Sequence, residues 1–145
     1  MINYNWSVNR YALIDCNISR LWKIITIESN LELFHLFCKN NRVIKWPGSD
    51  SIDEIEYLNG SIFQRNFCGW INEVGYDLYI NQIDKPFSFV TWRLSEKKNQ
   101  SVIKITVYPY LFNRGYKIIN FFPFFFVVRP LLSKYLGSVV GGLKL

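Results

Sequence analysis

The sequence predicts an α+β protein built on an antiparallel β-sheet of about seven strands. Three observations carry this prediction. Apolar residues recur at helical spacing between residues 18 and 37, alternate with polar residues between 43 and 112, and return to helical spacing after residue 130. The spacers between the alternating runs are short, which favours consecutive hairpins over crossover helices. No repeat or low-complexity linker divides the chain, so we expect residues 1–145 to form one domain.

The first element is a predicted strand over residues 10–16, and a short amphipathic helix follows it. Asn17 is a suitable N-cap, and its side chain can accept a hydrogen bond from a free backbone N–H of the first turn. The apolar positions of residues 18–25 then fall at helical spacing.

A second helix is predicted to begin at Ser29-Asn30-Leu31-Glu32, which fits a capping box. Its apolar residues run to Phe37, and it should end near Asn40-Asn41.

Strands are then predicted over residues 43–46, 53–58 and 61–71. Asn59-Gly60 between two alternating runs is a strong hairpin signal. A two-residue loop would place Glu54 opposite Arg65 and would put Asp53, Ile55 and Tyr57 on one face. Four cross-strand residues, Ile62, Gln64, Asn66 and Trp70, would share that face. If the faces of the hairpin are reversed, Gln64 and Asn66 point to solvent, and Phe63 and Phe67 lie inside.

Three more strands are predicted over residues 75–83, 87–96 and 101–112. A long helix over residues 132–143 closes the chain, and Pro123 and Pro130 must start or kink helical structure before it.

The charge of the chain is divided unevenly along its length. Of a net +6, residues 1–96 carry −2 (9 basic, 11 acidic) and residues 97–145 carry +8 (8 basic, none acidic).

With 50% hydrophobic residues and 19% charged, the composition excludes a disordered chain. Three cysteines in 145 residues exclude a disulfide-stapled miniprotein. The start of the chain shows no signal-peptide pattern, and the apolar run 118–128 is shorter than the roughly 20 residues of a membrane span. We therefore expect a cytoplasmic protein with reduced thiols.

Four local patterns, together with the order of elements, resemble a known superfamily. They are the helical run 18–25 followed by residues 31–35, the hairpin 53–60, the strand 90–94 and the ending 130–143. The chain resembles the START-like superfamily, also called SRPBCC, over about residues 8–143, and its bacterial polyketide cyclase and lipid-transport-like members in particular. The resemblance implies a helix-grip fold, in which a curved sheet wraps the long C-terminal helix and encloses a cavity. It implies no catalytic signature, only a habit of binding apolar ligands.

Such a cavity would be lined by apolar side chains from both the sheet and the helices. The candidate ligand-binding residues are Phe34, Phe37, Tyr57, Ile62, Gln64, Asn66, Trp70, Trp92, Tyr108, Phe121, Phe125, Tyr135 and Val139. Asp53, on the same predicted face as Gln64 and Asn66, is a third candidate for orienting a ligand. The alternative for each aromatic residue is that it fills the core and leaves no cavity.

Catalysis has weaker support than binding. A single histidine excludes a multi-histidine metal site, and we expect no metal, no cofactor and no catalytic residue. His35 and Cys38 would be neighbours on the predicted helix, but no third group orients them. Asp53, Asp77, Tyr57 and Arg93 could serve a cyclase or aromatase, although their spacing does not demand it.

We therefore predict a carrier or sensor of a hydrophobic small molecule or lipid. A cyclase/aromatase-like enzyme is one alternative. The other is a peripheral membrane protein, in which Phe124–Phe126 insert and Arg114, Lys117, Arg129 and Lys134 face anionic lipid. Nucleic-acid binding is not expected, because the basic residues form no compact stripe.

Overall fold

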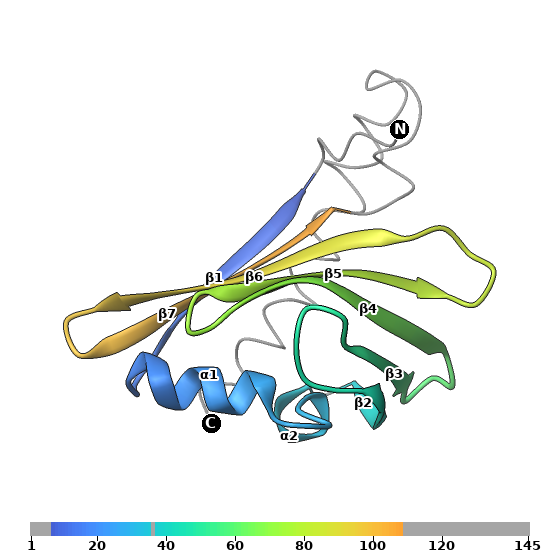
Figure 1. Cartoon of the computed structure of the whole chain (residues 1–145), viewed down its shortest axis with the longest axis horizontal. Coiled ribbons are helices and arrows are strands. Elements are labelled where there is room, and N and C mark those ends of the chain that lie inside the picture. Colours follow the sequence, from blue (N-terminus) through green and yellow to red (C-terminus); the bar gives the residue numbers. More distant parts are fainter. Residues whose placement is uncertain (1–6, 36, 109–145) are drawn as a thin grey trace, which may run out of the picture.

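Residues 7–35 and 37–108 are described by the computed structural model, and they form two helices and seven strands (Figure 1). The elements are β1 (Val8–Ile14), α1 (Ile18–Thr26), α2 (Leu31–Phe34), β2 (Cys38–Lys45), β3 (Ile52–Tyr57), β4 (Ile62–Ile71), β5 (Gly75–Gln82), β6 (Ser88–Lys97) and β7 (Gln100–Tyr108). The predicted C-terminal helix, and the rest of residues 109–145, lie outside the described residues.

All seven strands belong to one sheet, in the order β1-β7-β6-β5-β4-β3-β2, and every neighbouring pair is antiparallel. Strands β2 to β7 follow one another as consecutive hairpins, and β1 pairs with β7 from Val8↔Val107 to Ile14↔Ser101. The helices α1 and α2 lie against one face of the twisted sheet, below it in Figure 1. The α+β class, the seven antiparallel strands and the two helices after the first strand are thus confirmed.

Helix α1 forms as its local sequence predicts. Asn17 is its N-cap, and the Asn17 Oδ1 accepts a hydrogen bond from Arg20 N at 2.8 Å. The apolar stripe of the helix buries Leu21, Trp22 and Ile25 against the sheet. Full burial of each such side chain contributes roughly 1.5–3 kcal/mol, so this helix is held by its apolar face.

The second predicted helix is wrong in its length and in its cap. Helix α2 is a single turn, and the chain from Cys38 onward forms β2 instead. The Ser29 Oγ donates to Asn41 O, and the Glu32 Oε2 accepts from Asn41 N, so neither side chain caps the helix. A helix this short is marginal alone, and pairing with β3 satisfies the backbone groups along one side of β2, which lies at the edge of the sheet.

The predicted β3–β4 register is wrong by one residue. The hairpin turns through three residues, Leu58-Asn59-Gly60, because Tyr57 N donates to Ser61 O and Gly60 N donates to Tyr57 O, both at 2.9 Å. Gly60 has φ +88°, the left-handed position of a three-residue hairpin loop. Asp53 therefore lies opposite Arg65, and not Glu54 as predicted. A slip of one residue moves every side chain of β4 to the other face, so the reversed-face alternative is correct for Phe63 and Phe67.

An aromatic cluster fills the space between α1, the end of β4 and the start of β5. Trp22, Trp46, Phe67, Trp70 and Tyr76 contact one another with ring centroids 5.0–6.1 Å apart. A β-bulge between Phe67 and Gly69 brings Trp70 to the same face as Phe67. This part of the inner face is solid core, which agrees with the core-filling alternative for the aromatic residues.

Candidate ligand-binding cavity

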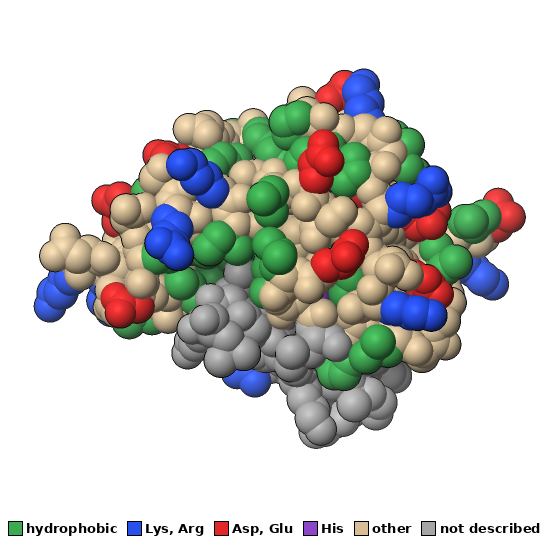
Figure 2. Space-filling model, turned by 90° about the horizontal axis from the view of Figure 1, so that it is seen from below, with side chains coloured by type: hydrophobic (Ala, Val, Ile, Leu, Met, Phe, Trp, Pro, Cys, Tyr) green, Lys and Arg blue, Asp and Glu red, His purple; other side chains and the backbone are tan. Residues whose placement is uncertain are grey.

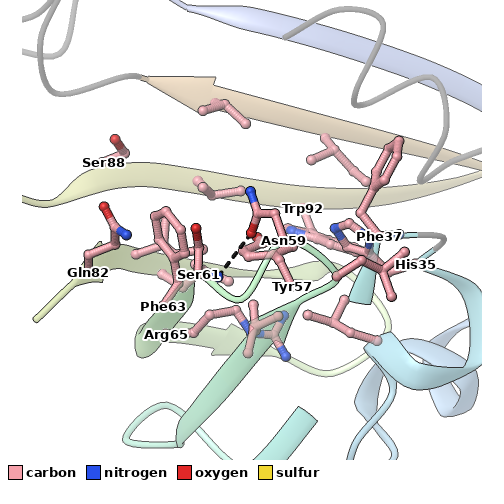
Figure 3. A pocket seen from close by; sticks show the side chains of 18 residues that line it. His35, Phe37, Tyr57, Asn59, Ser61, Phe63, Arg65, Gln82, Ser88 and Trp92 are labelled. Carbon is pink, nitrogen blue, oxygen red and sulfur yellow. Dashed lines mark hydrogen bonds between the residues drawn. The ribbon is translucent and has the colours of Figure 1, made fainter. Parts of the chain in front are cut away.

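The other part of the inner face is hollow. A cavity of about 650 Å³ lies between strands β3–β7 and the segment that joins α2 to β2. Figure 3 shows its side chains converging from these elements. The cavity is lined by Leu31, His35, Phe37, Ile55, Tyr57, Leu58, Asn59, Ser61, Phe63, Arg65, Leu78, Ile80, Gln82, Ser88, Val90, Trp92, Ile105 and Val107.

The walls of the cavity are predominantly apolar because the inner positions of the central strands carry aliphatic residues. Leu78 and Ile80 of β5, Val90 of β6, and Ile105 and Val107 of β7 alternate with side chains on the opposite face. At the inner end the buried Trp92 contacts the ring of Phe34 at 6.0 Å and that of Tyr76 at 5.4 Å. The cavity therefore ends where the solid core begins.

Among the described residues, those at the rim of the cavity are polar but uncharged. Asn59 and Ser61 come from the β3–β4 loop, and Gln82 and Ser88 come from the ends of β5 and β6. The Asn59 Oδ1 accepts a hydrogen bond from Ser61 N at 2.9 Å, the dashed line in Figure 3. Asn59 and Gln82 are exposed, whereas Ser61 and Ser88 are half-buried, so these residues mark the end of the cavity that is nearer to solvent.

The one charged lining side chain among the described residues is Arg65, and it is buried with its counterion. The Arg65 Nε donates to the Asp53 Oδ1 at 2.8 Å, and its Nη2 donates to the Asp53 Oδ2. The two side chains are 3% and 0% exposed. Burial lowers the pKa of Arg65, but the charge and the hydrogen bonds of Asp53 raise it by more, so the pKa is raised overall.

Asn41 completes this buried polar group. The Asn41 Nδ2 donates to the Asp53 Oδ2 at 2.9 Å and to Glu54 O at 3.2 Å, and its Oδ1 accepts from Leu31 N at 3.2 Å. The side chain thus connects α2, β2 and β3.

His35 lies at the C-cap of α2, with its ring between Phe37 and Tyr57, at centroid distances of 6.2 and 5.6 Å. The His35 Nδ1 accepts a hydrogen bond from Phe37 N at 3.2 Å, which fits a neutral ring. Burial lowers the pKa of His35, the positive charge of Arg65 lowers it further, and a backbone hydrogen bond partly offsets both, giving a value of about 4.

We predict that His35 makes the stability of the protein depend on pH between about 4 and 6.5. Because the folded pKa lies below the unfolded one, the unfolded chain binds the proton more readily in this range. The free energy of unfolding is therefore highest above pH 6.5, where His35 is neutral in both states. It falls by on the order of 3 kcal/mol as the pH is lowered to about 4.

His35 is the single histidine of the chain, so its NMR titration is unambiguous. Urea unfolding of the wild type and of His35→Gln over this pH range isolates its contribution from that of the carboxylates. An NMR pKa close to 6.5 would contradict the prediction.

Cys38 does not form a nucleophilic pair with His35. The two residues lie at the end of α2 and the start of β2, where Cys38 N donates to His35 O at 3.0 Å, and they are not neighbours on one helix. Burial and the nearby Glu32 carboxylate raise the pKa of the Cys38 thiol to about 11. At neutral pH the thiol is protonated and the imidazole is neutral, unlike an activated thiolate–imidazolium pair.

The structure brings three of the predicted ligand-binding residues into the cavity: Phe37, Tyr57 and Trp92. Phe34 and Trp70 face the same side of the sheet but belong to the packed core around it. Phe121, Phe125, Tyr135 and Val139 lie outside the described residues.

Four predicted cavity residues, in contrast, lie on the opposite face of the sheet. The register slip places Ile62, Gln64 and Asn66 there, and the Gln64 Nε2 donates to the Asn66 Oδ1 at 3.4 Å. Tyr108 follows the cavity-lining Val107 and packs on Phe89 with centroids 5.8 Å apart. Strand alternation puts it outside.

The acid–base candidates are also separated from one another. Asp77 and Arg93 form an ion pair with a 2.7 Å N–O distance on the face away from the cavity. Asp53 is held by Arg65 behind the cavity wall. Only Tyr57 of the four candidates lines the cavity.

Sequence reasoning did not place Arg65 or His35 at the cavity, and both side chains line it. Arg65 would have followed from the reversed-face alternative, which turns it inward together with Phe63 and Phe67. The sequence predicts His35 on a helix surface, because its helical signals extend beyond the actual end of α2.

The described part of the surface carries nearly balanced charge. Residues 7–108 hold 12 basic and 11 acidic side chains, so +1 of the net +6 belongs to them. Figure 2 shows Lys and Arg side chains interspersed with Asp and Glu over one face. The basic, Phe-rich segment on which the membrane prediction depends lies in residues 109–145, outside the described residues. Within residues 7–108, no helix has the length and hydropathy to cross a membrane.

The fold has many counterparts among solved structures. DynU16, a protein of the dynemicin biosynthetic locus, superposes with a TM-score of 0.72 at 11% identity over 97% of this chain, and this chain spans 46% of its length. TTHA0849 from Thermus thermophilus gives 0.71 at 13% identity, covering 95% of this chain and 94% of its own. CalU16 from Micromonospora echinospora gives 0.64 at 12% identity, covering 95% and 71%.

No family model matches the chain, and no curated protein matches it in sequence. At identities this low, the structural likeness shows the fold alone. The neighbours share the fold of the described residues, which is consistent with the helix-grip fold that the sequence resemblance implies.

Proposed function

We propose that this protein binds a hydrophobic small molecule or lipid in the cavity of the inner face, as a carrier or sensor. The observation that carries the proposal is the cavity of about 650 Å³ with apolar walls and a small number of polar groups. Ligand sites typically have volumes of roughly 300–1,000 Å³ and this kind of lining. Each CH₂ group of a ligand that leaves water there gains about 0.8 kcal/mol.

Binding without chemistry fits the state of the ionisable groups in and beside the cavity better than catalysis does. The Cys38 thiol has a raised pKa, the His35 imidazole has a lowered pKa, and Asp53 is engaged by Arg65 and Asn41. The thiol and the imidazole are thus held in their neutral forms, and the Asp53 oxygens are already hydrogen-bonded, whereas a nucleophile or general base needs an activated group.

Titration with N-phenyl-1-naphthylamine, an uncharged apolar dye that fluoresces in apolar surroundings, tests the proposal. We expect saturable binding with one site per chain, and native mass spectrometry should show copurified small molecules of lipid-like mass. Absence of both signals for the folded protein would overturn the proposal.

A cavity-filling substitution should block the dye. Val107→Trp places an indole in the cavity from β7, and we expect the affinity to fall at least about tenfold, which is 1.4 kcal/mol. Val102→Trp is the matched control, because Val102 lies on the same strand but on the opposite face. Equal affinities of the two variants, measured by the same titration, would place the dye elsewhere.

A cyclase/aromatase-like enzyme is the second candidate. Its support is the similarity to DynU16 of a biosynthetic locus, together with Arg65, His35 and Tyr57 at one cavity, where they could polarise a carbonyl. Incubation with a linear 3,5-dioxo ester tests it, because cyclisation produces a new aromatic absorbance. No conversion at saturating protein would leave binding as the function.

A further inference from the structure

We propose that the cavity selects uncharged ligands and discriminates against the ionised form of an otherwise equal molecule, because Arg65, the one charged side chain among the described residues that line it, is already neutralised by Asp53. This inference rests on the proposed binding function and specifies the chemical class of the ligand. The class is a mostly apolar molecule that ends in a hydroxyl, carbonyl or ester group.

The charges at the described part of the cavity wall balance one another. Among the described residues that line the cavity, Arg65 is the one charged side chain. Asp53 accepts two hydrogen bonds from it side-on, one of them 2.8 Å long, and both side chains are buried. Arg65 and Asp53 therefore present a net charge of zero to the cavity.

A ligand cannot easily open the Arg65–Asp53 pair. The Asp53 Oδ2 also accepts a hydrogen bond from the Asn41 Nδ2 at 2.9 Å, and Asn41 is itself held by Leu31 N. A ligand carboxylate that took over the guanidinium would leave Asp53 as a buried anion without its cation. Such a charge is strongly unfavourable in an apolar interior.

The cavity does offer hydrogen-bonding groups to a polar but uncharged part of a ligand. A guanidinium has five N–H donors, of which Asp53 accepts two and the Tyr76 hydroxyl engages another, so Arg65 keeps some donor capacity although its charge is balanced. The rim residues Asn59, Ser61 and Gln82 are amides and a hydroxyl, which suit a neutral oxygen. Figure 3 shows Arg65 on one side of the cavity and Ser61, Gln82 and Ser88 gathered toward one end.

Three ligands with the same ten-carbon chain test the inference: decan-1-ol, decanoate and decylammonium. They are compared at about pH 8, where the acid and the amine are both ionised, by displacement of N-phenyl-1-naphthylamine. We expect the alcohol to bind at least about tenfold more tightly than either ion. Decanoate binding as tightly as the alcohol in the wild type would overturn the inference, and so would decylammonium.

Asp53→Asn supplies the second arm. The amide still offers an oxygen to the Arg65 Nε but removes the balancing charge, so we expect the decanoate-to-decanol affinity ratio to rise at least about tenfold. Glu54→Gln is the matched control, because it makes the same change of charge one residue later on the exposed Arg42 pair. An unchanged ratio in folded Asp53→Asn, or an equal rise in Glu54→Gln, would overturn the role of Asp53. If Asp53→Asn does not fold, the wild-type ratios alone decide.

The failures of the two proposals are distinguishable. If the dye and all three ligands fail to bind, the proposed function itself is wrong. If they bind without discrimination by charge, the binding function stands and the inference about the ligand class fails.

Discussion

Replacing Arg65 with methionine is expected to lower the free energy of unfolding by about 3–5 kcal/mol. The substitution leaves the Asp53 carboxylate buried without its cation, and Asp53 is 0% exposed. Methionine is close to arginine in length and apolar, so it fills much of the same space. The loss therefore reports on the uncompensated charge more than on packing.

A double replacement separates these two contributions. Asp53→Leu combined with Arg65→Met removes both charges, and we expect most of the lost stability to return, because apolar pairs often replace buried ion pairs at little cost. Arg42 and Glu54 provide the comparison on the exposed face, with an N–O distance of 3.3 Å. Arg42→Met should cost less than about 1 kcal/mol.

Urea unfolding followed by tryptophan fluorescence and circular dichroism measures all four proteins. If Arg65→Met costs no more than Arg42→Met, the guanidinium is not the partner on which the buried carboxylate depends. If the double variant is as unstable as the single one, the loss comes from packing and not from charge.

The elements predicted correctly are those whose signals are local. Asn17 caps α1, and the apolar stripe behind it is read from nine consecutive residues. The strands β5, β6 and β7 follow from alternation, within two residues of their predicted starts. The pairing of β1 with β7 joins distant parts of the chain, and no local pattern in the sequence predicts it.

The errors arise where two local solutions compete and a distant contact decides. Asn59-Gly60 suits a two-residue loop, but it also suits a three-residue loop with glycine in the left-handed position. The three-residue loop is the one that buries Phe67 and the Arg65–Asp53 pair. This burial depends on neighbouring strands, whose positions cannot be predicted from the sequence of the hairpin alone. The same competition shortens α2, whose helical signals yield to the pairing of β2 with β3.

The candidate site was predictable to the same extent. Phe37, Tyr57 and Trp92 line the cavity, and their positions do not depend on the register of β4. That they bind a ligand stays a prediction. The polar group of the cavity was not found, because turning Arg65 inward requires the correct register. A polar residue in a cavity is thus the hardest part of such a site to predict from one sequence.

Gly75→Ala is expected to destabilise the protein by about 3 kcal/mol or more, through both strain and collision. Gly75 opens β5 with φ +153°, a conformation that residues with a Cβ rarely adopt. A Cβ atom there would lie 1.9 Å from the carbonyl oxygen of Trp92 and 3.2 Å from the Cα of Arg93. Both contacts are to the backbone of β6, so no side-chain rotation can relieve them.

Gly60→Ala is the matched control, because Gly60 also has a positive φ, +88°, but no atom lies within 4 Å of the position of its Cβ. Its cost should be near 1 kcal/mol, from conformation alone.

Urea midpoints and dye affinity are measured for both variants. Relief of the collision at Gly75 must displace β6 at Trp92, which lines the cavity, so Gly75→Ala should weaken dye binding as well. Gly60 touches the cavity only through its loop neighbours and should leave dye affinity within about twofold. Equal urea midpoints for the two variants would contradict the prediction and would mean that β6 moves to make room for the added methyl group. The inner end of the cavity would then be less rigid than the packing of Trp92 against Phe34 and Tyr76 indicates.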